Sequence, residues 1–221
     1  MKRALLVVGQ YTPAEPGTEA VAKAVDPAHR VRCAGPNDLL AAVKAAVTAQ
    51  GGPLTRLDIF DHGKGGLQQL GPHVLFGVPD AKTTATKMVG FDLLKSLSAS
   101  LTHDAHIRLL GCETAMLAEG QRLLLDAAEA AGFQRVIYGT VDDIVANHFD
   151  ADGFKQIAEC PFLFSSHDAK LRLAPPHQKK LTECNWKQPT GPADDDPVMT
   201  VARLRKEHAK CPSCGRQLTA D

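Results

Sequence analysis

Short apolar runs alternate along the chain with stretches whose apolar residues recur every three or four positions. That alternation predicts parallel strands joined by crossover helices. Strand-like runs cover Ala4–Gly9, Leu54–Asp61, His106–Leu110, Arg135–Tyr138 and, as the shortest, Phe162–Phe164. Helical spacing covers Asp38–Gln50, Gly90–Leu101 and Met116–Ala131. The expected fold class is therefore α/β, a mostly parallel sheet flanked by helices on both faces.

Turn-forming residues set the ends of these elements. Asn37 is a candidate cap for the helix that starts at Asp38, and Gly51-Gly52-Pro53 stops that helix. Gly132 closes the helix that ends at Ala131. The segment LQQLGPHVLF, residues 67–76, has a Gly-Pro pair at its centre, which predicts a small hairpin outside the main sheet.

The composition changes at Leu171, where Pro, Lys and Asp replace the apolar runs. We therefore expect one principal domain over residues 1–170, and a linker with a C-terminal tail over residues 171–221. A short helix over Val198–His208 is expected before the CPSC sequence at Cys211–Cys214.

Charge and apolar content narrow the class of partner. Lys plus Arg and Asp plus Glu are equal at 25 each, so the chain lacks the basic surplus that binding to nucleic acid requires. No window approaches the ~18 consecutive apolar residues of a membrane span, and the apolar run near Met1 is too short for a signal peptide. The expectation is a soluble cytoplasmic protein whose six cysteines are reduced thiols and whose partner is neither nucleic acid nor membrane.

Residues that carry chemistry follow two of the strand-like runs. His62 follows Leu54–Asp61, and Cys112 follows the run HIRLLG 50 residues later. A right-handed crossover between two parallel strands would leave both side chains at the same rim of the sheet. A cysteine attacks as the thiolate, and a neighbouring histidine that takes its proton is the natural activator.

Each of these residues alone has an ordinary structural interpretation. A lone histidine is usually a surface residue, and a lone cysteine is usually a small core residue. The pairing of the two at strand ends carries the inference. The Gly63 and Cys112 N–H groups are the candidate donors to an oxyanion, because a glycine lets its backbone approach a substrate closely.

These residues resemble the caspase-haemoglobinase fold, whose members include caspases, legumains, gingipains, separases and bacterial caspase-like domains. Asp61-His62-Gly63 is similar to the legumain histidine motif, and GCETAM at Gly111–Met116 is similar to the legumain pattern around the cysteine. The caspase form, Gln-Ala-Cys-Arg-Gly, differs from this chain at four of five positions. The hairpin segment also resembles the insertion that follows the histidine in bacterial caspase-like domains. The resemblance spans roughly residues 1–170.

The resemblance implies a cysteine endopeptidase that cleaves a protein or peptide partner through a thioester acyl-enzyme and needs no cofactor for catalysis. Cys112 would be the nucleophile, His62 the acid and base, and Gly63 and Cys112 the oxyanion donors. Asp142 or Asp143, beyond the run that ends at Tyr138, would line the first subsite and select a basic residue. A cap on the following turn is an equal reading of the Asp pair. Asp61 either orients the histidine loop or is a solvated acid at a strand end.

The CPSC sequence is half of a zinc site, because two thiolates across one turn supply two of four tetrahedral ligands. Cys184, His208, Cys211 and Cys214 together would make a Cys₃His set, although their spacing fits no strong template. Free thiols are the alternative.

Two other functions remain open from the sequence. One is a catalytically inactive caspase-like scaffold that binds a partner protein. The other is a different acyl-transfer cysteine enzyme on a doubly wound sheet.

Overall fold

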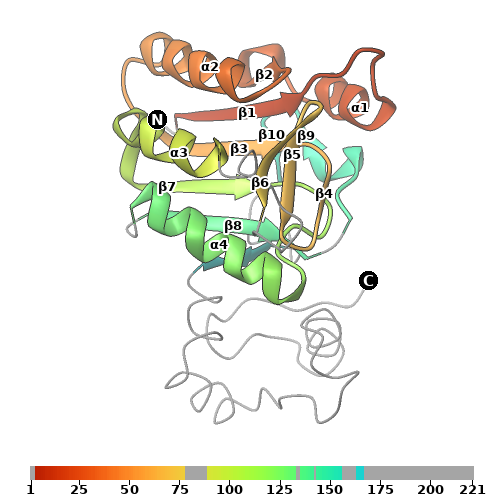
Figure 1. Cartoon of the computed structure of the whole chain (residues 1–221). Helices are drawn as coiled ribbons and strands as arrows, with labels where there is room; N and C mark the ends of the chain where they lie inside the picture. The colour runs from red at the N-terminus through yellow and green to blue at the C-terminus, as the bar shows by residue number, and fades with distance from the viewer. Residues whose placement is uncertain (1–2, 78–88, 133–134, 142, 156–162, 167–221) are drawn as a thin grey trace.

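A six-stranded sheet forms the centre of the computed structural model, which describes residues 3–77, 89–132, 135–141, 143–155 and 163–166 (Figure 1). The strand order is β11-β8-β7-β3-β1-β2. The strands β2, β1, β3, β7 and β8 run parallel to one another, and β11 runs antiparallel to β8. The strands are β1 (Ala4–Gly9), β2 (Arg30–Cys33), β3 (Leu54–Phe60), β7 (Leu101–Leu109), β8 (Val136–Thr140) and β11 (Leu163–Ser165).

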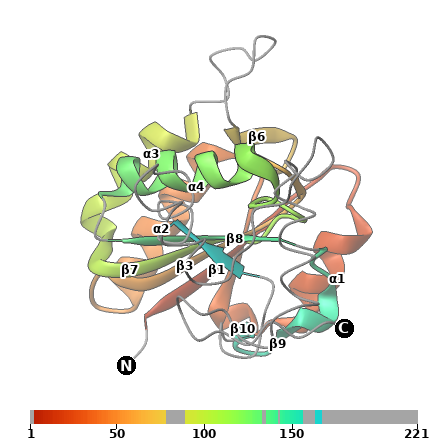
Figure 2. The ribbon, with the colours of Figure 1, turned by 90° about the horizontal axis from the view of Figure 1, so that it is seen from below.

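Helices cover both faces of this sheet, as predicted. The helices are α1 (Pro16–Ala24), α2 (Pro36–Ala49), α3 (Val89–Leu97) and α4 (Leu117–Ala131), with short 3₁₀ turns at Pro27–His29, Ser98–Ser100 and Ala146–His148. α2, α3 and α4 pack in one core, and α1 packs in a second core with β9 (Phe149–Asp150) and β10 (Gly153–Phe154). Figure 2 shows α3 and α4 on one side of the sheet and α1 with β9 and β10 on the other.

The continuous apolar runs of the central strands follow from this two-sided burial. Along β3, Leu57 and Ile59 enter the core of α2 to α4, and Phe60 enters the core of α1. Successive side chains of a strand point to opposite faces, so both sets must be apolar when both faces are covered. The exception is Asp58, which forms a fully buried ion pair with Arg108 on the adjacent strand β7.

A second, three-stranded antiparallel sheet stands at the end toward which the parallel strands point (Figure 1). It consists of β4 (Gly63–Lys64), β5 (Leu67–Leu70) and β6 (His73–Gly77). The predicted hairpin at Gly71-Pro72 is therefore confirmed. The strand β4, directly after His62, adds a third member that the sequence did not indicate.

Several boundaries differ from the sequence expectation. α2 starts at Pro36 with Gly35 as its cap, so Asn37 lies inside the helix. Proline suits the first helical turn because its N–H would have no partner there. β7 begins at Leu101, five residues before the predicted His106. The prediction missed the first half of this strand because Thr102, His103 and Asp104 are polar and at least partly exposed. The elements α1 and β2 were not predicted.

Within the described part of the chain, no helix is long and apolar enough to cross a membrane. The predicted linker, the helix over Val198–His208 and the CPSC turn lie outside the described residues.

Candidate active site

β3 and β7 are adjacent parallel strands, and they deliver His62 and Cys112 to the same edge of the sheet. Ile59 is the register partner of Leu109, and the Leu110 N–H donates to the Ile59 carbonyl at 2.8 Å. His62 and Cys112 each lie three residues beyond that paired position. The prediction that one rim carries both residues is confirmed.

The loops that carry the two residues touch through glycines. A Cβ atom added to Gly63 would lie 2.8 Å from the Gly111 Cα and 2.4 Å from Thr114 Oγ1. Real Cβ atoms do not approach backbone so closely, so a side chain at Gly63 would push the loops apart. The absence of a side chain at both glycines brings the backbone beside His62 against the backbone beside Cys112.

Gln68 of β5 joins the same two loops with its buried amide. Its Oε1 accepts the Gly111 N–H at 2.8 Å, and its Nε2 lies 3.5 Å from the His62 carbonyl. Thr114 Oγ1 adds a bond to the Gly111 carbonyl at 3.0 Å and lies 3.2 Å from Gln68 Oε1. Sequence reasoning assigned no role to either residue, because nothing in LQQL shows which glutamine points inward.

Asp61 orients the histidine loop and is not a solvated acid, since the residue is 2% exposed. Its Oδ1 accepts the Tyr11 hydroxyl and the His62 N–H, each at 2.7 Å, and its Oδ2 accepts the Gly71 N–H at 2.5 Å. Burial raises the pKa of the Asp61 carboxyl, and the three donors oppose that rise. The Asp61 carboxylate therefore holds the His62 backbone, and none of these three hydrogen bonds reaches the imidazole.

The His62 imidazole lies in a partly open position, with the side chain 52% exposed. Its Nε2 is 3.8 Å from Glu15 Oε2, and the Tyr11 ring packs edge-on against it at 5.7 Å between centroids. Between the described side chains of His62 and Cys112 there is no hydrogen bond. Neither Glu15 nor Tyr11 was selected from the sequence, since both belong to the β1–α1 segment, in which no element was expected.

Cys112 lies in the tight turn between β7 and α4, where Glu113 takes the left-handed conformation with φ 56°. The half-buried Cys112 Sγ accepts the Ile144 N–H at 3.5 Å and lies 3.9 Å from the Ile144 carbonyl. Burial raises the pKa of the Cys112 thiol; the Ile144 N–H opposes this, and the charge and hydrogen bond of Asp143 add to the rise. In this resting state Cys112 is a thiol at neutral pH.

The register of the small sheet leaves the Gly63 N–H out of the hydrogen bonds between β4 and β5. Gly63 pairs with Gln68, and the Gln69 N–H donates to the His62 carbonyl at 2.9 Å. That flanking bond shows that Gly63 and Gln68 form a non-hydrogen-bonded pair, in which the N–H groups point away from the partner strand. The Gly63 N–H is therefore oriented away from β5, as an oxyanion donor requires.

Of the two predicted subsite residues, the structure describes only Asp143. This residue is exposed, and the charge and hydrogen bond of its carboxylate raise the pKa of the Cys112 thiol. Asp142 lies outside the described residues, as do the predicted zinc ligands Cys184, His208, Cys211 and Cys214. Among the side chains that the structure does describe, no group of three or more His, Cys, Asp or Glu residues could hold a metal ion.

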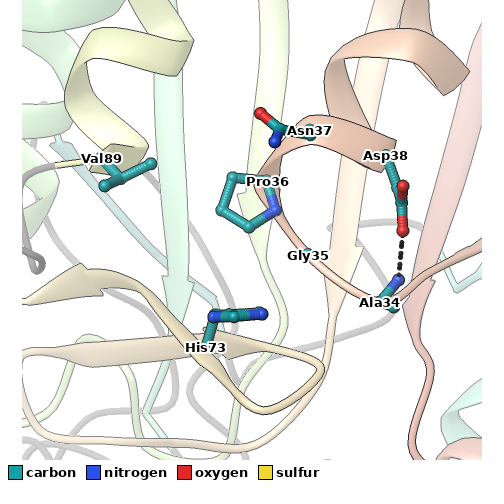
Figure 3. Close-up of a pocket in the computed structure, with 7 residues that line it drawn as sticks. All are labelled: Ala34, Gly35, Pro36, Asn37, Asp38, His73 and Val89. Carbon is teal, nitrogen blue, oxygen red and sulfur yellow. Dashed lines mark hydrogen bonds between the residues drawn. The ribbon is translucent and has the colours of Figure 1, made fainter.

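A pocket of about 330 Å³ opens at the start of α2, beside the turn of the small sheet (Figure 3). Its lining comes from the α2 N-terminus, His73 of β6 and Val89 of α3, and Asp38 accepts the Ala34 N–H there at 2.9 Å. Neither His62 nor Cys112 lines this pocket. The pocket lining therefore does not include the candidate catalytic residues.

A family model described as Domain of unknown function (DUF4347) matches residues 16–139, which is more than half of the 221-residue chain. The chain belongs to the DUF4347 family. The DUF4347 match spans His62, Gly63, Gln68 and Cys112, begins one residue after Glu15 and ends before Asp143. No curated protein and no solved structure matches the chain.

The raised pKa of Cys112 predicts how its alkylation depends on pH. Because only the thiolate reacts with iodoacetamide, the rate at Cys112 should still be increasing above about pH 8.5, the ordinary cysteine pKa. Removing the neighbouring charge in Asp143→Asn should shift the profile to lower pH, whereas the exposed control Asp152→Asn should not. Peptide mapping by mass spectrometry separates Cys112 from the other thiols. A rate plateau already reached below pH 7 would instead show a stabilised thiolate.

Proposed function

We propose that the chain is a cysteine endopeptidase of the caspase-haemoglobinase type, with Cys112 as nucleophile and His62 as acid and base. The observation that carries the proposal is the contact of Gly63 with Gly111, which sets the two loops against each other at the carboxyl edge of the sheet. The contact brings the backbone beside His62 against the backbone beside Cys112, as a catalytic edge shared by the two residues requires. The small sheet directly after His62 agrees with the resemblance to bacterial caspase-like domains.

The chemistry follows from the groups at this edge. The Cys112 thiol gives its proton to His62, and the sulfur attacks the carbonyl carbon of the scissile peptide bond. The carbonyl π electrons move to oxygen, and the Gly63 and Cys112 N–H groups donate to that oxyanion. The C–N bond then breaks as His62 returns the proton to the leaving amine, which leaves a thioester on Cys112. Water, deprotonated by His62, hydrolyses the thioester and restores the thiol.

The resting contacts of Cys112 fit a site that becomes active when substrate binds. The Cys112 Sγ accepts a hydrogen bond from the Ile144 N–H, and the pKa of the Cys112 thiol is raised. Proton transfer to His62 therefore accompanies the attack on the substrate instead of preceding it. Geometry in unliganded sites is commonly looser than in the complex with substrate. A substrate backbone inserted at this edge would displace the Ile144 contact.

The preferred substrate is a protein or peptide with Lys or Arg before the scissile bond. Asp143 supports this preference, because its exposed carboxylate lies at the nucleophile. A cationic side chain placed there would offset the negative charge and relieve its effect on the Cys112 thiol.

An inactive scaffold is the second candidate. The observation that favours it is the separate engagement of the two side chains, His62 with Glu15 and Cys112 with Ile144. In that case the same edge would bind a partner segment without cleaving it.

Kinetics of two variants test the dyad. Cys112→Ala should remove peptide cleavage altogether, and His62→Ala should lower kcat by about 10²–10⁴-fold, the usual contribution of proton transfer. A fluorogenic peptide library supplies the substrates, and circular dichroism checks the fold. The control His103→Ala, an exposed histidine near the start of β7, should leave kcat unchanged. Cleavage by Cys112→Ala at the parent rate would reject the proposal.

Substrate preference tests the role of Asp143. In Asp143→Asn, kcat/KM for substrates with Lys or Arg should fall by up to about fivefold relative to otherwise identical substrates with Gln, the range for a charge pair at an exposed carboxylate. Taking the ratio of the two substrates cancels the effect of Asp143 on Cys112 itself. The same substrate ratio measured in Asp142→Asn shows whether the neighbouring carboxylate contributes to the preference. An unchanged ratio in Asp143→Asn would remove that carboxylate from the subsite.

A further inference from the structure

The helix α1 begins with an unusual cap, Glu15. Its Oε1 accepts the Gly17 N–H at 3.0 Å and its Oε2 accepts the Thr18 N–H at 2.7 Å. Caps are ordinarily Ser, Thr, Asp or Asn, whose short side chains reach these donors directly. The two N–H bonds hold the longer Glu15 side chain in one orientation.

That orientation turns the Glu15 carboxylate toward His62. Glu15 Oε2 lies 3.8 Å from His62 Nε2, and the Tyr11 ring packs edge-on against the imidazole at 5.7 Å between centroids. Asp61 is also near, but its oxygens accept from Tyr11, from Gly71 and from the His62 backbone. Among the described residues, Glu15 is therefore the carboxylate that faces the ring nitrogen.

We propose that Glu15 is a positioning residue for His62, a role that rests on the proposed function. With its proton on Nε2 facing Glu15, the imidazole presents the unprotonated Nδ1 to the Cys112 thiol. When the Cys112 proton moves to Nδ1, the ring becomes a cation and the Glu15 carboxylate stabilises it. When Nδ1 gives that proton to the leaving amine, the ring returns to its starting tautomer.

The charge state of Glu15 is consistent with this role. Burial acts to raise the pKa of its carboxyl, but the Gly17 and Thr18 N–H groups and His62 outweigh burial and lower it. Glu15 is therefore a carboxylate at neutral pH. Glu15 Oε2 accepts the Thr18 N–H and also faces His62 Nε2, so the start of α1 sets the position of the imidazole.

The variant Glu15→Asp separates the cap from the contact with His62. Aspartate is a preferred cap and should keep the parent Tm, but it is one methylene shorter and withdraws the carboxylate from Nε2. We expect kcat to fall by up to about fivefold, the range for a half-exposed charge pair, with KM unchanged. Glu19→Asp on the same helix is the control: Glu19 pairs with Arg32 and not with His62, so kcat should be unchanged. In the His62→Ala background, Glu15→Asp should cause no further loss, because its effect passes through the imidazole.

A second readout does not depend on catalysis. ¹⁵N–¹H correlation spectra of the full chain report which nitrogen of the neutral His62 ring carries the proton. We expect Nε2–H in the parent and a mixture of tautomers in Glu15→Asp and Glu15→Ala. An unchanged tautomer in both variants would overturn the proposal. A tautomer that depends on Glu15 in a parent that cleaves no peptide would uphold the contact and reject the peptidase.

Discussion

The buried Asp61 carboxylate holds together the three segments that build the candidate site. Its oxygens accept one hydrogen bond from Tyr11 after β1, one from the backbone of His62 after β3, and one from Gly71 in the turn of the small sheet. A Cβ atom on Gly9 would lie 1.8 Å from Asp61 Oδ2, so the end of β1 must be glycine to admit the carboxylate. Three donors offset part of the cost of burying the carboxylate, which is otherwise several kcal/mol.

Each of the three segments contributes a different part of the site. The β1–α1 segment carries Glu15 and Tyr11 to the imidazole, and the small sheet carries Gln68 to the loop before Cys112. Gln68 links the His62 loop to the Cys112 loop, because its Nε2 contacts the His62 carbonyl and its Oε1 accepts the Gly111 N–H. The hydrogen bonds of Asp61 and Gln68 hold the backbone of both loops, while Glu15 and Ile144 contact the two reactive side chains.

The parallel α/β class and the rim that carries His62 and Cys112 could be predicted from the sequence, because central parallel strands are buried on both faces and have continuous apolar runs. The elements that were missed do not have that signature. β2 is an edge strand with alternating arginines, and α1 begins with Pro16-Gly17, residues typical of turns. Because α1 was not predicted, Glu15 was not recognised as its cap. The proposed role of Glu15 also depends on its closeness to His62, which lies 47 residues further along the chain. Gln68 and Thr114 could not be assigned because polar residues in loops are informative only once their partners are placed.

The most direct test of the central claim is covalent labelling with peptidyl acyloxymethyl ketones that carry Lys or Gln before the reactive group. Such a probe alkylates a cysteine only when the enzyme binds it as a substrate and aligns the sulfur with the reacting carbon. Intact-mass and peptide mapping of the full chain should show one equivalent of the Lys probe on Cys112, slower labelling by the Gln probe, and loss of labelling in His62→Ala. Labelling shared among the other thiols, or labelling of Cys112 that is equally fast without His62, would contradict the assignment of this edge as a catalytic site.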